Sequence, residues 1–212
     1  MKAKIKEMIS SFVATSPLNR TEDGIHLYYD APLVGFADAE DPYFQGLKSV
    51  IGEFHLTPSE FFDDAFGAGA VEGGTVIAWV LPFSQALRDR SRPETSLPAK
   101  EWSHGRFYGE IVNDELRRHV VDFLSGNGFR ALAPSLSPRW ERLHDVRVGH
   151  ASRWSERHAA YAAGLGTFSL SDGLITARGI AHRLGSVVAG LAVEADHRPY
   201  IGSYDYCLKY SS

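Results

Sequence analysis

A run of residues that is apolar on both faces covers positions 75–81 and stops at Pro82. Successive side chains of a β-strand point to opposite faces of the sheet, so such a strand has to be covered on both sides. The run therefore predicts a central strand. It favours a layered protein in which helices pack on the faces of a sheet.

Helix signals recur along the chain. Ile5, Ile9 and Val13, together with Met8 and Phe12, follow the spacing of one helix face. Residues 57–60, Thr-Pro-Ser-Glu, have the N-cap, the proline and the glutamate of a capping box, which predicts that a helix begins there and ends in the glycines of 67–74. Further helices are predicted over residues 43–51, 110–124 and 152–163, and the first helix is predicted to end near Thr15.

Short apolar runs predict the remaining strands. These strands are expected at residues 25–29, 33–37, 129–133 and 186–193, whereas the charged, proline-containing stretch 84–100 predicts a long mobile connection. The order of elements lacks the regular βαβ spacing of a dinucleotide-binding domain. The predicted fold class is a single α/β (α+β) sandwich over residues 1–212, with a mixed, largely antiparallel central sheet and helices on its faces.

Composition limits the classes of function. The formal net charge is −4, so no general basic surface favours nucleic acid, and tRNA is an unlikely partner. The single cysteine, Cys207, cannot form an internal disulfide or hold an iron–sulfur cluster alone, and an inert thiol is expected. Serines interrupt the apolar residues near the amino terminus, so no signal peptide or membrane segment is expected and the predicted location is cytoplasmic.

Three common site patterns are disfavoured. Gly164 and Gly166 follow a helix, whereas a dinucleotide fingerprint follows a strand, so they predict a helix C-cap turn. The nine histidines lack the paired spacing of a zinc site, and no metal ligands are predicted. The chain also lacks the nucleophile elbow of a serine hydrolase.

Residues 156–188 nevertheless resemble the epoxyqueuosine reductases and their corrinoid and iron–sulfur relatives. The resemblance rests on Glu156 and Arg157, the Ala-Gly-Leu-Gly turn at 163–166, the Leu-Ile-Thr segment at 174–176 and the glycine-containing strand at 183–188. A weaker match is Gly-Arg-Phe-Tyr at 105–108, before the 110–124 helix. Residues 32–42 and 75–82 add fainter similarity.

The resemblance implies a nitroreductase-like domain that binds cobalamin or a related corrinoid and receives electrons from an iron–sulfur domain or ferredoxin. Reduced cobalt would then act on a small-molecule substrate. The residues that would line the corrin, carried over by their positions, are Arg106, Tyr108, Gly164, Leu165, Gly166, Thr167, Ser169, Leu174, Ile175, Gly185 and Ser186.

The sequence departs from the family pattern in two places. His150 stands where the family has a catalytic aspartate, and it is the candidate proton donor. The cysteine-rich, two-cluster domain expected after residue 207 is missing. Two alternatives therefore stay open: a non-catalytic corrinoid-binding, sensor or partner-binding module, and a flavin-dependent enzyme of the nitroreductase type.

Overall fold

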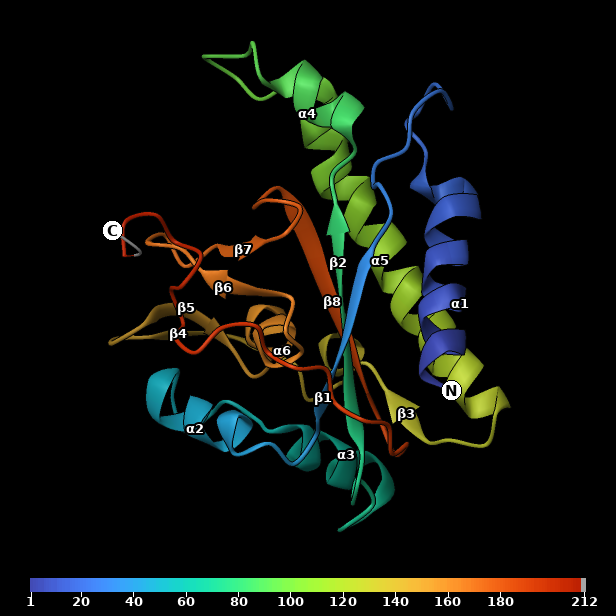
Figure 1. Ribbon diagram of the computed structural model, residues 1–212, viewed down its shortest axis with the longest axis vertical. Helices are drawn as coiled ribbons and strands as arrows, with labels where there is room; N and C mark the ends of the chain where they lie inside the picture. Colours follow the sequence, from blue (N-terminus) through green and yellow to red (C-terminus); the bar gives the residue numbers. More distant parts are fainter. Residues whose placement is uncertain (211–212) are drawn as a thin grey trace.

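The computed structural model describes residues 1–210, and its centre is a four-stranded sheet in the order β1-β2-β8-β3 (Figure 1). The strands are β1, Leu33–Asp38; β2, Thr75–Pro82; β3, Ala131–Leu132; and β8, His182–Ala189. Every residue of β2 is buried, and each neighbouring pair in the sheet is antiparallel. The predicted central strand and the α+β class with a largely antiparallel sheet are confirmed.

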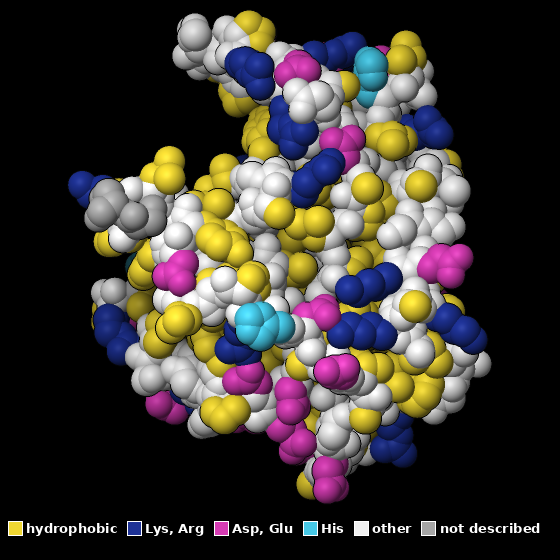
Figure 2. Space-filling view, in the orientation of Figure 1, with side chains coloured by type: hydrophobic (Ala, Val, Ile, Leu, Met, Phe, Trp, Pro, Cys, Tyr) yellow, Lys and Arg dark blue, Asp and Glu magenta, His cyan; other side chains and the backbone are white. Residues whose placement is uncertain are grey.

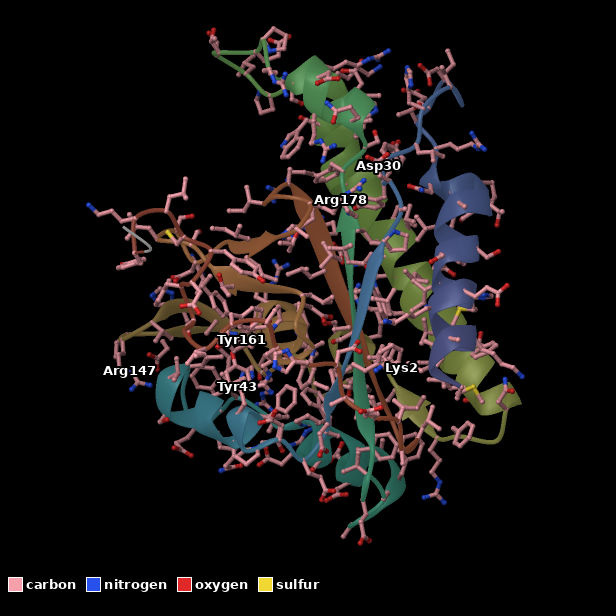
Figure 3. All side chains as sticks on the ribbon, in the orientation of Figure 1. Lys2, Asp30, Tyr43, Arg147, Tyr161 and Arg178 are labelled. Atoms are coloured by element: carbon pink, nitrogen blue, oxygen red, sulfur yellow. The ribbon has the colours of Figure 1, made fainter. Side chains whose placement is uncertain are left out.

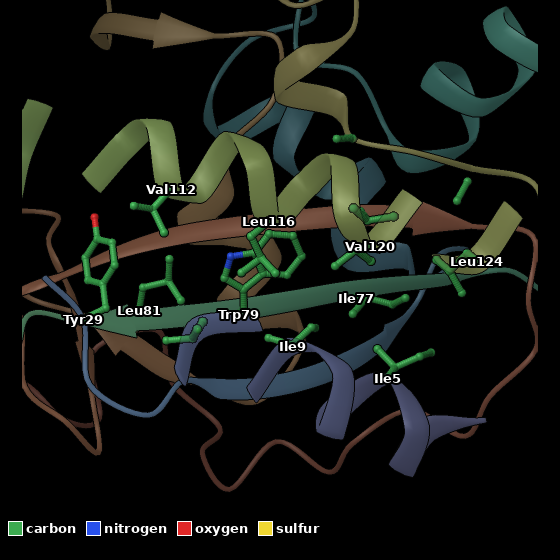
Figure 4. Close-up of a cluster of buried hydrophobic side chains, with 14 of the residues drawn as sticks. Ile5, Ile9, Tyr29, Ile77, Trp79, Leu81, Val112, Leu116, Val120 and Leu124 are labelled. Atoms are coloured by element: carbon green, nitrogen blue, oxygen red, sulfur yellow. The ribbon is translucent and has the colours of Figure 1, made fainter. Parts of the chain in front are cut away.

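One face of the sheet is covered by α1, Lys2–Thr15, and by the long helix α5, Lys100–Gly126. Ile5 and Ile9 of α1 and Leu116 of α5 pack with Ile77 and Trp79 of β2 (Figure 4). The buried residues of α1 are the ones that its apolar spacing predicts. This face holds the largest apolar cluster of the described chain.

The opposite face is covered by α2, Pro42–Val50, α3, Pro58–Phe66, and α6, Glu156–Ala162. Phe61, Ala159 and Trp154 pack there with Val76 and Ala78 of β2. The predicted capping box is present, with reciprocal hydrogen bonds between Thr57 and Glu60 at 2.8 and 3.2 Å. Alternate residues of β2 therefore face two different helical layers.

Two small hairpins lie beside the main sheet. They are formed by β4, Arg142–Asp145, with β5, Gly149–Ser152, and by β6, Gly166–Phe168, with β7, Leu174–Thr176. The other elements are α4, Gln85–Ser91, and two short 3-10 helices, Pro17–Asn19 and Pro134–Leu136. Residues 190–210 contain no helix or strand and run back past β1, where Asp196 donates its N–H to the carbonyl of Phe36 at 2.8 Å.

The predicted strand at residues 25–29 is wrong. Only isolated bridges occur there, from Leu27 to Arg20 and from Tyr29 to Phe83. The reason is the buried side chain of Asn19, whose amide accepts from the N–H of Tyr29 at 2.9 Å and donates to its carbonyl at 3.1 Å. One side chain thus satisfies the backbone groups that a strand partner would otherwise bind.

The connection predicted at 84–100 is wrong over residues 85–91, which form α4, whereas residues 92–99 contain no helix or strand. Ser84 caps α4, and α5 begins at Lys100, ten residues before the predicted start. The segment 105–108 therefore lies inside α5. Gly105 lies within the helix and lets the side chains of Leu87 and Phe83 pack closely against its backbone. A Cβ at this position would lie 2.9 Å from Leu87 and 3.0 Å from Phe83. The many polar residues of this stretch lie on the exposed sides of α4 and of the first turns of α5, so the sequence pattern did not indicate these helices.

The late elements differ from their predictions mainly at their ends. Ser152 belongs to β5, and α6 begins only at Glu156. The strand predicted at 186–193 begins at His182 and ends at Ala189, because β2 provides pairing partners from Pro82 back to Thr75. The strand predicted at 129–133 shortens to β3. In residues 1–210, no helix combines the length and the apolar character needed to span a membrane.

Gly109 of α5 and Gly46 of α2 form a matched pair that tests the packing of α5. A Cβ at position 109 would lie 2.2 Å from the hydroxyl of Tyr29, whereas at position 46 it would meet no atom within 4 Å. Gly46→Ala should stabilise the protein by up to about 1 kcal/mol through helix propensity. Gly109→Ala should destabilise it by about 1–3 kcal/mol through overpacking. Urea unfolding measures both, and equal stabilisation by the two substitutions would contradict this packing.

Candidate functional site

The segment that carries the family resemblance folds as one continuous unit, from α6 through the β6–β7 hairpin into β8 (Figure 1). Gly164 has φ of +77°, and its N–H binds the carbonyl of Tyr161 while that of Leu165 binds Ala160. These two bonds form a Schellman motif, which confirms the predicted C-cap turn. Glycine is needed here because the left-handed conformation is costly for other residues.

The protein's own backbone covers this turn. A Cβ on Gly164 would lie 2.8 Å from the carbonyl oxygen of His197, and one on Gly166 would lie 2.2 Å from that of Ile175. The hydroxyl of Thr167 is buried and accepts a hydrogen bond from the N–H of Tyr206 at 2.9 Å. The close approach that these glycines permit is therefore used by neighbouring strands and by the segment 190–210.

Other predicted cofactor residues are also in contact with protein groups. Gly185 lies under the indole of Trp79, where a Cβ would come within 2.5 Å of the ring. Leu174 is buried in a small cluster with Tyr161, while Ser169 bonds the hydroxyl of Ser171 at 3.0 Å. Their roles toward a ligand stay predictions.

The predicted residues divide between two faces of the sheet. Leu165 packs against Gly35 on the face covered by α6, since a Cβ at position 35 would lie 3.0 Å from it. Arg106 and Tyr108 belong to α5, which covers the other face. Tyr108 is two residues from Arg106 on the helix, so the two side chains point in different directions. A single flat ligand cannot contact all of these residues in one plane.

A buried arginine joins the two layers. Arg117 of α5 has a side chain only 3% exposed. Its guanidinium contacts carboxylates of Glu110 at 3.0 Å, Asp114 at 2.6 Å and Glu156 at 3.1 Å, and the carbonyl of Leu184 at 3.1 Å. Burial opposes its charge, but Glu156 and Glu110 outweigh that effect and raise the pKa of Arg117. The charge is thus compensated inside the protein.

Glu156, the first residue of the resemblance, is the second centre of this network. Its carboxylate accepts hydrogen bonds from the hydroxyls of Ser135, at 2.6 Å, and Ser186. Ser186 in turn accepts from the indole of Trp154 at 3.0 Å. Ser186, a predicted cofactor residue, is itself buried and joins β8 to the partly buried Glu156 of α6.

The open end of the sheet has a different character. Phe83, Trp102 and Arg106 face residues 180–183 around a pocket of about 130 Å³. Two residues at this end have a buried polar atom without a hydrogen-bond partner, the hydroxyl of Tyr29 and Nδ1 of His182, whereas Nε of Arg183 lies 3.4 Å from the carboxylate of Glu110. Tyr29 packs against Phe83 at a ring distance of 5.2 Å, directly behind the pocket.

The surface on this side of the molecule is hollowed. Figure 2 shows an indentation between the end that carries α4 and the lobe of the β6–β7 hairpin and the C-terminal segment. Asp30 and Arg178 lie close together at the turn before β8 (Figure 3), with their charged atoms 3.8 Å apart. The same carboxylate of Asp30 lies 3.8 Å from Arg88 of α4. These contacts fix the turn against α4.

The candidate proton donor, His150, lies on the exposed edge of the β4–β5 hairpin. Its ring faces that of His144 across the hairpin, with centroids 5.2 Å apart. Cys207 is a free, buried cysteine. Residues 1–210 contain no group of three or more His, Cys, Asp or Glu side chains arranged to hold a metal ion.

Sequence reasoning missed the roles of Asn113, Arg117, His182 and Arg183. A signal was present for two of them, because Asn113 and Arg117 share the helical stripe of Leu116, Val120 and Leu124. A polar residue on a buried stripe needs internal partners. Asn113 accepts from the indole of Trp79 and donates to the carbonyl of Leu184, both at 2.9 Å.

Comparison with known proteins gives matches only among solved structures, since no family model and no curated protein matches the chain. The structure of epoxyqueuosine reductase from Streptococcus thermophilus is 15% identical, with a TM-score of 0.48; the match covers 95% of this chain and 49% of that chain. The structure of the enzyme from Bacillus subtilis is also 15% identical, with a TM-score of 0.48, and the match covers 98% of this chain and 50% of that chain. The structure of an epoxyqueuosine reductase with a tRNA stem loop is 15% identical, with a TM-score of 0.41, and the match covers 92% of this chain and 46% of that chain. The chain spans about half the length of these proteins.

His158 generates a prediction about acid stability. Burial lowers its pKa to about 3, and the charges of His55 and Arg157 act in the same direction. The ring bonds the hydroxyl of Ser155 at 2.7 Å and packs on Phe168. The unfolded chain binds a proton near pH 6.5 whereas the folded protein does not, so stability falls as the pH falls below about 6.5.

Between pH 6.5 and 5 this histidine should cost the folded protein about 2 kcal/mol. His158→Phe keeps an aromatic ring and removes the titration, so its loss of stability over that interval should be smaller. His150→Gln, at an exposed position, serves as the control and should behave like the unsubstituted protein. Urea unfolding at each pH measures the difference. Parallel profiles for His158→Phe and the unsubstituted protein would contradict the assignment.

Proposed function

We propose that this chain binds cobalamin or a related corrinoid and serves as the corrinoid-binding domain of an epoxyqueuosine-reductase-like reductase. The whole chain, 1–212, would form that one domain. The support comes from the motif at 156–188 and from the open end of the sheet, to which that motif contributes the start of β8. The cobalt of a bound corrinoid would supply the reducing chemistry.

The observation that carries the proposal is a pair of buried polar atoms without hydrogen-bond partners at the open end, the hydroxyl of Tyr29 and Nδ1 of His182. Buried polar atoms normally have hydrogen-bond partners, because an unsatisfied group costs roughly 1–3 kcal/mol. His182 donates from Nε2 to the carbonyl of Leu174 at 2.8 Å, so its Nδ1 is left as an acceptor. Burial lowers the pKa of His182, which keeps the ring neutral.

The chemistry of these atoms fits the edge of a corrin. The macrocycle carries amide side chains, which both donate and accept hydrogen bonds. An amide N–H can donate to Nδ1 of His182, and an amide oxygen can accept from the hydroxyl of Tyr29. Arg106, an exposed residue of α5, is one of the residues that line the pocket, together with His182.

The glycine turn does not fit the predicted contact with the flat face of the ligand in this conformation. His197 covers Gly164, and Gly166 is in contact with Ile175. Contact with a corrin face at this turn would require residues 190–210 to move away. We therefore assign the turn to shaping the β6–β7 hairpin, and the edge contacts to Arg106, His182 and Arg183.

Electrons would have to come from clusters outside residues 1–212, held either by a separate protein or by a further part of the same polypeptide. The sequence has one cysteine, whereas a four-iron cluster is usually held by four. An iron–sulfur domain or a ferredoxin is the expected partner. A small organic molecule is the expected substrate, since the net charge of −4 gives no general attraction for tRNA.

One observation favours a non-catalytic corrinoid-binding, sensor or partner-binding module as the second candidate. His150 is exposed on β5 and its ring neighbour is His144, whereas the pocket lies between α5 and the start of β8. The position that the resemblance assigns to the proton donor is thus on a separate hairpin. If the second candidate is right, His150→Ala leaves every measured property of the protein unchanged.

Cobalamin uptake tests the proposal. Hydroxocobalamin mixed with the purified protein should change its visible spectrum and raise the melting temperature, because ligand at about 100 times Kd stabilises by about 2.7 kcal/mol. Arg106→Ala should weaken binding, whereas Arg118→Ala, an exposed arginine farther along α5, should not. Absence of both the spectral and the thermal change would refute corrinoid binding. A flavin spectrum and a thermal shift with FMN alone would support the flavin enzyme instead.

A further inference from the structure

The pocket between α5 and the start of β8 has an aromatic wall. Phe83 and Trp102 line it with ring centroids 4.7 Å apart and ring planes tilted by 43°. Its volume is about 130 Å³. This is slightly less than the roughly 150 Å³ of an engineered closed cavity that holds benzene, but the pocket opens to the surface, so a six-membered ring can enter it with its polar substituent left outside. Ile180 and Ala181 complete the apolar part of the lining.

The two arginines at the rim differ in how their charges are compensated. Arg183 lies 3.4 Å from the carboxylate of Glu110, and its Nη2 donates to the backbone carbonyl of Arg106 at 2.5 Å. The guanidinium of Arg106 takes part in no ion pair or hydrogen bond recorded for residues 1–210. One lining residue, Arg106, therefore carries a planar cation without a counter-charge, and a guanidinium matches the geometry of a carboxylate.

The pocket is held in shape by contacts on both of its sides. Asp30 joins Arg178, in the turn before β8, to Arg88 of α4 (Figure 3). His182 bonds the carbonyl of Leu174, which holds the lining stretch against β7. Because these residues are already fixed, a ligand would not have to order them on binding.

We propose that this pocket binds a small aromatic carboxylate of about the size of benzoate. The ring lies against Trp102 and Phe83, and the carboxylate pairs with the guanidinium of Arg106. This binding does not depend on a corrinoid. The further step, that such an acid is the organic substrate, rests on the proposed function.

Calorimetric titration with benzoate tests the site on the full chain, and the fluorescence of Trp102 provides a second readout. Benzyl alcohol supplies the ring without the charge, and acetate supplies the charge without the ring. Benzoate should bind at least tenfold more tightly than either. Arg106→Gln should weaken benzoate binding at least tenfold, whereas Arg118→Gln, at an exposed position of the same helix, should leave it unchanged.

The outcomes separate this site from the proposed function. Benzoate that binds no better than acetate, or equally well to Arg106→Gln, overturns the pocket assignment. If benzoate binds as described and hydroxocobalamin does not, the carboxylate site stands and the corrinoid proposal falls. If hydroxocobalamin binds and benzoate does not, the corrinoid proposal stands and the pocket assignment falls. The circular dichroism spectrum of Arg106→Gln confirms that a loss of binding is not a loss of folding.

Discussion

The contact on which the rest of the site depends is the one between Arg117 and Glu156. These two residues lie on opposite helical layers, α5 and α6, and their charged atoms are 3.1 Å apart at the edge of β8. A buried charge without a partner is strongly unfavourable, so each residue holds the other's helix in place. The carbonyl of Leu184 accepts from both Arg117 and Asn113, which ties β8 to the same point.

This arrangement explains why the predicted cofactor residues fall into two groups. Strand β8 separates them, since Gly185 faces Trp79 on the α5 side and Ser186 faces Glu156 on the α6 side. Only at the start of β8 do the two layers meet an open surface. His182, whose Nδ1 has no partner, lines the pocket there together with Arg106 and Arg183. A ligand that uses both groups would have to reach around the end of the sheet.

The fold was predictable wherever the pattern of the residues is set by burial. Residues 75–81 required two covering layers, and the Thr57 capping box fixed the start of α3. The strand prediction at 25–29 failed because the buried side chain of Asn19, which lies outside the apolar run, bonds the backbone of Tyr29 in place of a strand partner. The early start of α5 was not predicted, because Gly105 and Gly109 look like helix breakers. In the structure their missing side chains leave room for the rings of Phe83 and Tyr29.

The candidate site was predictable only in part. The motif identified the unit from α6 to β8, but a motif does not show that His197 covers Gly164 or that Ser186 is used by Glu156. These contacts join residues that lie far apart in sequence. The place of His182 was hidden for a similar reason, since it precedes the segment 183–188 and becomes part of the strand only through pairing with Pro82.

A double-mutant cycle between Arg117 and Glu156 tests most directly whether this buried pair holds the two layers together. Urea unfolding of Arg117→Met, Glu156→Gln and the double variant gives the coupling energy. Arg117→Met should cost about 3–5 kcal/mol, Glu156→Gln should cost less because Glu110 and Asp114 still pair with Arg117, and the coupling should reach about 1.5 kcal/mol or more. The exposed pair Arg118 and Glu115 provides the comparison and should couple by no more than about 0.5 kcal/mol. Equal coupling in the two pairs would contradict the account.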